Sequence, residues 1–182
     1  MTDEELMCQV QRGNQAAFEE LFKRYDRKIF NYLLRDLGDE ELAKDLFQET
    51  FLRVFQFSRT YRPTASFAAW LYTIARNVCR KQWGREPMRE RMRESAWKAL
   101  EEEVPTLNAT PQEARADQEL VEKIQQALDS LPESQREVVI LHKYQGLSYP
   151  QIAQVLGCSI SSVKQRAFRA YQGLRQHLAE YA

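Results

Sequence analysis

The side chains that could ligate a metal ion or act as nucleophiles are few and far apart in this sequence. They are three cysteines and two histidines: Cys8, Cys79, Cys158, His142 and His177. No pair has the Cys-x-x-Cys or His-x-x-x-His spacing that places two ligands together, so we expect no metal site. Three widely separated cysteines also suit reduced thiols better than a disulfide framework. A helical metalloenzyme is therefore the least favoured class of function.

A second group of chemically capable residues combines carboxylates with an amide and a guanidinium. Its members recur at three- and four-residue spacing and so share one face of a helix: Asp45, Gln48, Glu49 and Arg53. No apolar pocket is evident that would let one carboxylate act as an acid, so we predict no catalytic residues and no cofactor. The pattern is typical either of a solvated acidic face or of an acceptor surface for a partner helix. The opposite side of this helix is an apolar stripe that ends at Phe55.

The charges are unevenly distributed along the chain although 26 basic and 26 acidic residues cancel. Residues 1–49 carry a net charge of −5, residues 50–95 of +7, residues 96–137 of −6 and residues 138–182 of +4. Two basic blocks separated by acidic blocks indicate two contact surfaces for a polyanion, each on its own structural unit. Charge alone is equally compatible with solvated helix faces.

Apolar residues at three- and four-residue spacing predict an all-α fold, because no stretch alternates strongly enough for a strand. Four helices are expected in the N-terminal part, beginning at Thr2, Asn14, Asp39 and Ser66. The fourth helix places apolar side chains on one side and basic and amide side chains on the other. These helices form the first predicted domain, residues 1–95.

A polar segment separates this domain from a second helical domain. Residues 96–115 have too little apolar surface to offset the entropy of ordering, so we predict a flexible linker. In the second domain, residues 116–182, one helix follows Pro132 and ends at Gly146. A short helix capped by Ser148 and a longer basic helix then form a helix-turn-helix.

Three motifs, in this order, resemble those of bacterial RNA polymerase sigma factors of the extracytoplasmic function (ECF) group. The stretch DLFQETF at 45–51 resembles the polymerase-binding helix of the family, and WLYTIARN at 70–77 resembles its −10-element helix. The chain from Leu131 onward resembles the −35-binding domain. The resemblance covers nearly the whole chain and implies a dissociable promoter-specificity subunit that has no catalytic activity of its own.

The resemblance also implies contacts for individual residues. Asp45, Gln48 and Glu49 would contact the coiled coil of the clamp of core RNA polymerase, with Arg53 beside them. Reading the −10 element requires holding single-stranded bases with aromatic, amide and cationic groups. The residues assigned to that task are Tyr61, Arg62, Arg76, Asn77, Arg80 and Lys81. We expect Trp70 to lie mainly in the core and Tyr72 on the polar side of its helix.

The −35 element would be read as duplex by the second helix of the helix-turn-helix in the major groove. The residues assigned to this contact are Ser161, Ser162, Lys164, Gln165, Arg166, Phe168 and Arg169. Lysine or arginine can pair with guanine, glutamine with adenine, and phenylalanine can touch a thymine methyl group. Arg166 is better suited to a phosphate contact. From Gly146 to His177 there is no acidic residue, so this face can approach phosphates.

The family makes an anti-sigma factor a further expected partner. We expect a cytoplasmic protein without membrane insertion, because the acidic start Met1–Glu5 does not resemble a secretory signal and no apolar run approaches the roughly 18 to 20 residues of a membrane span. The main alternative is a helix-turn-helix regulator that is not a polymerase subunit and whose N-terminal helices dimerise or sense a signal. That alternative predicts tight binding of the free protein to duplex DNA, whereas a sigma factor predicts weak binding.

Overall fold

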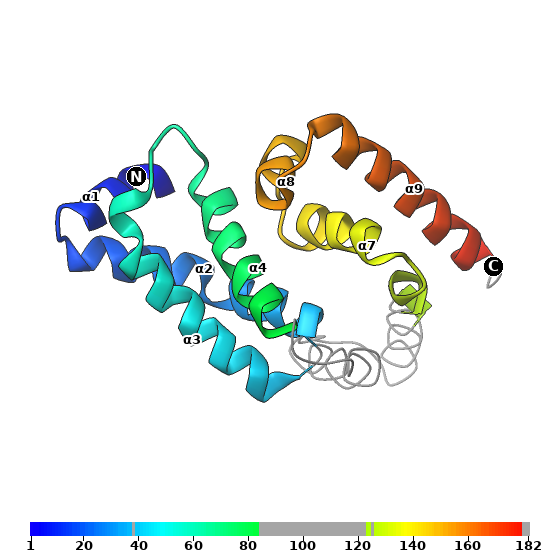
Figure 1. The fold of residues 1–182 in the computed structure, drawn as a ribbon, viewed down its shortest axis with the longest axis horizontal. Coiled ribbons are helices and arrows are strands. Elements are labelled where there is room, and N and C mark those ends of the chain that lie inside the picture. Colours follow the sequence, from blue (N-terminus) through cyan, green and yellow to red (C-terminus); the bar gives the residue numbers. More distant parts are fainter. Residues whose placement is uncertain (38, 84–122, 125, 180–182) are drawn as a thin grey trace, which may run out of the picture.

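The computed structural model describes residues 1–37, 39–83, 123–124 and 126–179. Every regular element among them is helical, which confirms the predicted all-α fold (Figure 1). The elements are α1 Asp3–Gln11, α2 Gln15–Leu37, α3 Glu40–Gln56, the short 3-10 helix η1 Ser58–Thr60, α4 Phe67–Trp83, α7 Glu133–Val139, the π-helix η2 Ile140–Tyr144, α8 Tyr149–Leu156 and α9 Ile160–Ala179. The predicted linker, residues 96–115, lies outside the described residues.

The predicted helix starts of the first unit are present and are fixed by side-chain caps. Thr2 forms a capping box with Glu5 at the start of α1. The Asn14 side chain accepts a hydrogen bond from the amide of Ala17 (3.3 Å), and Asp39 accepts one from the amide of Leu42 (2.9 Å). Each cap satisfies an amide that has no partner within its helix.

The helices of the first unit, α1 to α4, pack around a core rich in aromatic side chains. Phe22 on α2 contacts Phe51 on α3 with ring centroids 4.7 Å apart, and Phe47 lies 5.0 Å from Phe51. Such tilted aromatic pairs add to the stability that area burial provides. The core therefore fixes α3 against α2 and leaves the other side of α3 facing solvent.

The second unit contains the predicted helix-turn-helix, formed by α8 and α9. Ser148 and Gln151 form a capping box at the start of α8, and Gly157 ends it in the left-handed conformation with φ of +63°. The side chain of Ser159 accepts a hydrogen bond from the amide of Ser162 at the start of α9 (3.1 Å). The helix predicted between Pro132 and Gly146 is not α-helical throughout. Its last turns form the π-helix η2.

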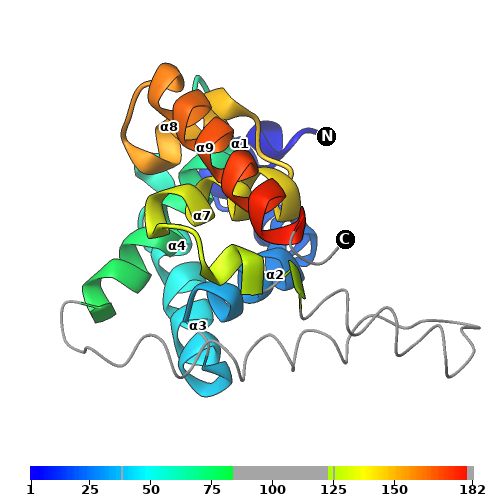
Figure 2. The ribbon, with the colours of Figure 1, turned by 90° about the vertical axis from the view of Figure 1, so that its right-hand side faces the viewer.

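The two units share one hydrophobic core in which α4 of the first unit packs against α8 of the second. Figure 1 shows the units side by side with α7 and α8 next to α4. In Figure 2, which turns the molecule by 90°, α9 lies toward the viewer, on the side of the second unit away from α3. The helix that carries the −10 candidates is therefore at the centre of the molecule, and the helix that carries the −35 candidates is at its edge.

Two sequence-based placements are wrong. Tyr72, expected on the polar side of its helix, is only 1% exposed, because the second unit covers that side of α4. Phe55, expected within a buried apolar stripe, is 63% exposed.

Candidate nucleic-acid and partner interfaces

The predicted polymerase-binding residues lie together on the solvent side of α3. Asp45 and Gln48 are exposed, while Glu49 and Arg53 are half-buried. The Nε of Arg53 lies 2.6 Å from Oε1 of Glu49, one helical turn away, which orients that carboxylate along the helix. The other side of the helix holds the buried residue Leu46, so the polar face rests on a packed support.

Two apolar side chains complete this face, and sequence reasoning missed both. Leu52 and Phe55 are 57% and 63% exposed, respectively. They lie seven residues after Asp45 and Gln48, a spacing that returns to the same side of a helix. The Phe55 ring meets Phe18 edge to face with centroids 5.8 Å apart, so it is held in place although it is exposed. The seven-residue spacing was the signal that could have separated these two residues from the core.

The loop between α3 and α4 contains the first of the −10 candidates, Tyr61 and Arg62. Arg62 is exposed, but Tyr61 is only 3% exposed and donates a hydrogen bond from its hydroxyl to the carbonyl of Ala65 (2.6 Å). Its ring packs against Trp70, which is half-buried against the core as expected, with centroids 5.2 Å apart. Burial, with the nearby Glu4 carboxylate, raises the pKa of the Tyr61 phenol to about 12. In this arrangement the Tyr61 ring offers no face on which a base could stack.

The remaining −10 candidates lie on α4 and divide into two groups. Asn77, Arg80 and Lys81 are exposed. Arg76 instead forms an ion pair with Glu137 of α7, and both side chains are less than one-fifth exposed. Burial lowers the pKa of Arg76, but the hydrogen bond and charge of Glu137 outweigh it, so the pKa is raised overall.

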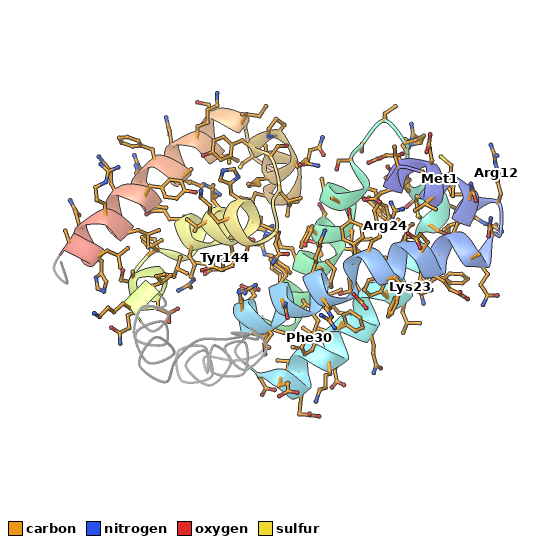
Figure 3. The ribbon with its side chains drawn as sticks, turned by 180° about the vertical axis from the view of Figure 1, so that it is seen from behind. Met1, Arg12, Lys23, Arg24, Phe30 and Tyr144 are labelled. Atoms are coloured by element: carbon orange, nitrogen blue, oxygen red, sulfur yellow. The ribbon has the colours of Figure 1, made fainter. Side chains whose placement is uncertain are left out.

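Three further contacts hold the second unit against the first. The Tyr72 hydroxyl donates to Oε1 of Gln145 (2.7 Å), and the Gln151 amide donates to the hydroxyl of Ser66 (2.7 Å). The guanidinium of Arg35 lies 4.3 Å from the centre of the Tyr144 ring, which extends toward α2 in Figure 3. Cation–π contacts are strongest when they are shielded from water, as this one partly is. The three contacts and the Arg76–Glu137 pair together form what we call the inter-unit contact.

A cavity of about 470 Å³ lies at this junction. Arg76 and Arg80 of the first unit and Arg166 of the second line it, together with the acidic residues Asp36 and Glu137. Candidate residues for the −10 element and for the −35 element therefore meet around one cavity.

Most of the −35 candidates occupy the outer side of α9, whereas Arg166 lines the cavity between the units. Val163, Ala167 and Ala170 are buried and face the rest of the second unit. Ser162 and Arg166 are half-buried, and the exposed candidates are Ser161, Lys164, Gln165, Phe168 and Arg169. Phe168 is 63% exposed, which is unusual for a large apolar side chain on a packed helix.

The described part of the chain contains no group of three or more histidine, cysteine or acidic residues arranged to hold a metal ion. Within the same part, none of the helices combines the length and apolar character needed to cross a membrane. Of the three cysteines, Cys79 is buried and the other two are half-buried.

Two packed helical units, the second with a helix-turn-helix, are typical of helical DNA-binding proteins. Comparison with known families narrows this class. The family model of sigma-70 region 2 matches residues 21–86, and that of sigma-70 region 4 matches residues 121–174. The ECF RNA polymerase sigma factor SigE of Mycolicibacterium smegmatis is 35% identical over 173 residues, 93% of this chain and 66% of that protein. The RNA polymerase sigma factor CarQ of Myxococcus xanthus is 34% identical over 168 residues, 92% of each chain.

Among solved structures, CnrH in complex with the cytosolic domain of CnrY is similar with a TM-score of 0.69 and 26% identity, covering 99% of both chains. The chain belongs to the ECF RNA polymerase sigma factors. It is therefore a DNA-binding transcription initiation factor that works with core RNA polymerase, and it is not an enzyme. This result rules out the alternative of a regulator that acts without polymerase.

Proposed function

We propose that this sigma factor binds core RNA polymerase through the outward face of α3, formed by Asp45, Gln48, Glu49, Leu52 and Phe55. The observation that carries the proposal is the exposure of two large apolar side chains, 57% and 63%, beside a row of hydrogen-bond acceptors. The acceptors can pair with arginines or amides of a partner helix, and burial of the apolar side chains favours binding. Arg53 contributes by orienting one of the acceptors, the Glu49 carboxylate, through their ion pair.

Contact with the −10 element is assigned to the exposed residues of α4 and of the loop before it. Asn77 supplies an amide for base edges, and Arg62, Arg80 and Lys81 supply cations for phosphates or bases. Arg76 can join them only after its ion pair with Glu137 breaks. Tyr61 supports the loop from the core side rather than contacting bases in this arrangement.

Contact with the −35 element is assigned to the outer side of α9, which enters the major groove. Lys164, Gln165 and Arg169 offer donors that distinguish bases, and Phe168 offers an apolar ring for a thymine methyl group. Ser161, Ser162 and Arg166 are suited to phosphates near the start of the helix.

This sigma factor cannot read both promoter elements in the closed arrangement described above. The elements are about 25 base pairs apart, which is about 85 Å of B-form DNA at 3.4 Å per base pair. Yet Arg80 and Arg166, one from each reading surface, line the same cavity of about 470 Å³. Promoter recognition therefore requires the two units to separate, and we propose that binding to core polymerase provides the energy for this step.

An anti-sigma factor is the partner best suited to keep the units closed. The solved structure of CnrH, which resembles this chain over 99% of its length, contains the cytosolic domain of CnrY as a bound partner. A protein that contacts both units at once would stabilise the closed arrangement by mass action and withhold the sigma factor from polymerase. We place this regulation in the cytoplasm, where polymerase and promoter DNA are found.

A pair of substitutions tests the assignment of surfaces. Leu52→Glu should lower the affinity for core polymerase at least tenfold, because it places a charge in the apolar part of the α3 face. Phe168→Glu is the matched control, since it places the same charge on an equally exposed apolar site of α9. It should keep core affinity but weaken binding to promoters that depend on the −35 element. Core binding is measured by fluorescence anisotropy and promoter use by run-off transcription; normal core affinity of Leu52→Glu would refute the assignment.

A further inference from the structure

The loop between α3 and α4 is held in place by side chains of α1, a helix that none of the contacts proposed above involves. The Gln11 side-chain amide donates two hydrogen bonds, to the backbone carbonyl of Ser58 (2.9 Å) and to that of Tyr61 (2.8 Å). A side-chain amide nitrogen has two hydrogens, and both are used here. Gln11 therefore fixes two points of the loop backbone, about 50 residues away in the sequence.

The other end of the loop is held by a second residue of α1. Oε1 of Glu4 accepts a hydrogen bond from the amide of Phe67, the first residue of α4 (3.0 Å). That amide has no partner within its own helix, and a carboxylate at a helix N-terminus is also favoured by the helix dipole. Glu4 thus helps to cap the N-terminus of α4, a role that usually belongs to a residue next to the helix in the sequence.

The chain between these two anchors exposes its tip. Arg62, Pro63 and Thr64 are exposed, whereas Tyr61 below them is buried and closes the loop through its hydrogen bond to Ala65. The position of the exposed tip therefore depends on the backbone that Gln11 and Glu4 hold.

We propose that Gln11 and Glu4 are positioning residues for recognition of the −10 element, acting through the loop without contact with DNA. The inference rests on the proposed role of the loop, represented by Arg62, in contacting −10 bases. Discrimination between bases requires donors and acceptors placed within a fraction of an ångström, so a loosened loop would still attract DNA but would select bases less well. Loss of the Gln11 amide would remove a donor from both loop carbonyls, leaving that of Ser58 with only the bond from the Tyr61 amide (3.2 Å), and would permit the loop to shift.

The test compares Gln11→Leu with Gln9→Leu in reconstituted holoenzyme. Gln9 is a glutamine on the same helix whose side chain bonds Asn14 and Met1 rather than the loop. Transcripts from a library randomised in the −10 element give the preference for each base. Gln11→Leu should lower the preference at the positions read by the loop about tenfold and leave the preference at the −35 element unchanged. Gln9→Leu should leave both unchanged.

Amide hydrogen exchange of the free full-length protein provides a readout that does not depend on DNA. Gln11→Leu should speed exchange in residues 58–67 and leave α9 as in the parent protein, and Glu4→Ala should do the same near Phe67. Unchanged exchange in the loop would overturn the inference and leave the proposed role of the loop standing. Faster exchange in the loop with an unchanged base preference at the −10 element would instead show that the loop takes no part in −10 recognition. That result would also overturn the inference. A uniform loss of protection, including α9, would show a general structural role and would also overturn it.

Discussion

The outward face of α3 and the polar side of α4 lie on two helices that pack against each other, and both faces combine charged or amide groups with a large apolar side chain. They differ in what covers them. On α3, Leu52 and Phe55 are more than half exposed, whereas on α4 Tyr72 is 1% exposed and Arg76 is paired with Glu137 of the second unit. The difference predicts an order of events in which the proposed polymerase-binding face is available at once and the proposed −10 face becomes fully available only after the units separate.

The largest effect is expected from reversing a charge on the accessible face. Glu49→Arg should lower affinity for core polymerase by about a hundredfold, because it removes an acceptor, places a like charge beside Arg53 and repels basic groups of the partner. Affinity is measured by competition with a labelled sigma factor. Glu19→Arg on α2 makes the same charge change at an exposed site outside this face and should have no effect. Equal loss in both variants would mean that overall charge, not the α3 face, governs binding.

A smaller effect is expected from breaking the ion pair through which the second unit packs on α4. Glu137→Arg places two like charges in a site where both side chains are less than one-fifth exposed, so it should shift the closed arrangement toward the open one at least tenfold. Small-angle X-ray scattering of the free protein should then show a larger radius of gyration. The double variant Arg76→Glu with Glu137→Arg restores opposite charges and should restore the compact form. A compact Glu137→Arg protein would show that this ion pair does not hold the units together.

The smallest effect is expected from removing one hydrogen bond of the inter-unit contact. Tyr72→Phe deletes the hydroxyl that donates to Gln145 and keeps the ring, so it should lower stability by about 1 kcal/mol. Thermal unfolding should show a Tm lower by a few degrees. Tyr61→Phe, which deletes the hydroxyl that donates to Ala65 within the first unit, should lower the Tm comparably but leave the closed arrangement intact. An equal change of compactness in both variants would contradict the special role of Tyr72.

Sequence reasoning succeeded where the signal was local. The caps at Thr2, Asp39 and Ser148 and the turn at Gly157 depend on residues within a few positions of one another, and the structure contains all of them. These local signals were sufficient for the all-α fold and for the helix-turn-helix. Helical periodicity likewise placed the four polar residues of α3 on one face.

The errors concern what packs against each helix. Periodicity separates apolar from polar residues but does not say which partner covers a side, so Tyr72 was placed at the surface and Phe55 in the core. The partner of Tyr72 is Gln145, 73 residues later, and the partner of Arg76 is Glu137, 61 residues later. A local sequence pattern cannot predict contacts between residues that are so far apart in the chain. The support of the loop by Gln11 was missed for the same reason.

We expect the proposed −10 face to be partly covered in the free sigma factor, at Tyr72 and Arg76, and fully uncovered in holoenzyme. The most direct measurement is the distance between labels at exposed positions of α4 and α8, which pack against each other in the closed arrangement, determined by single-molecule fluorescence in the free protein and again with core polymerase. We expect one short distance in the free protein and a clearly longer one in holoenzyme, and we expect the longer distance already in the free Glu137→Arg protein. A long distance in the free parent protein, or a short one in actively transcribing holoenzyme, would contradict this expectation.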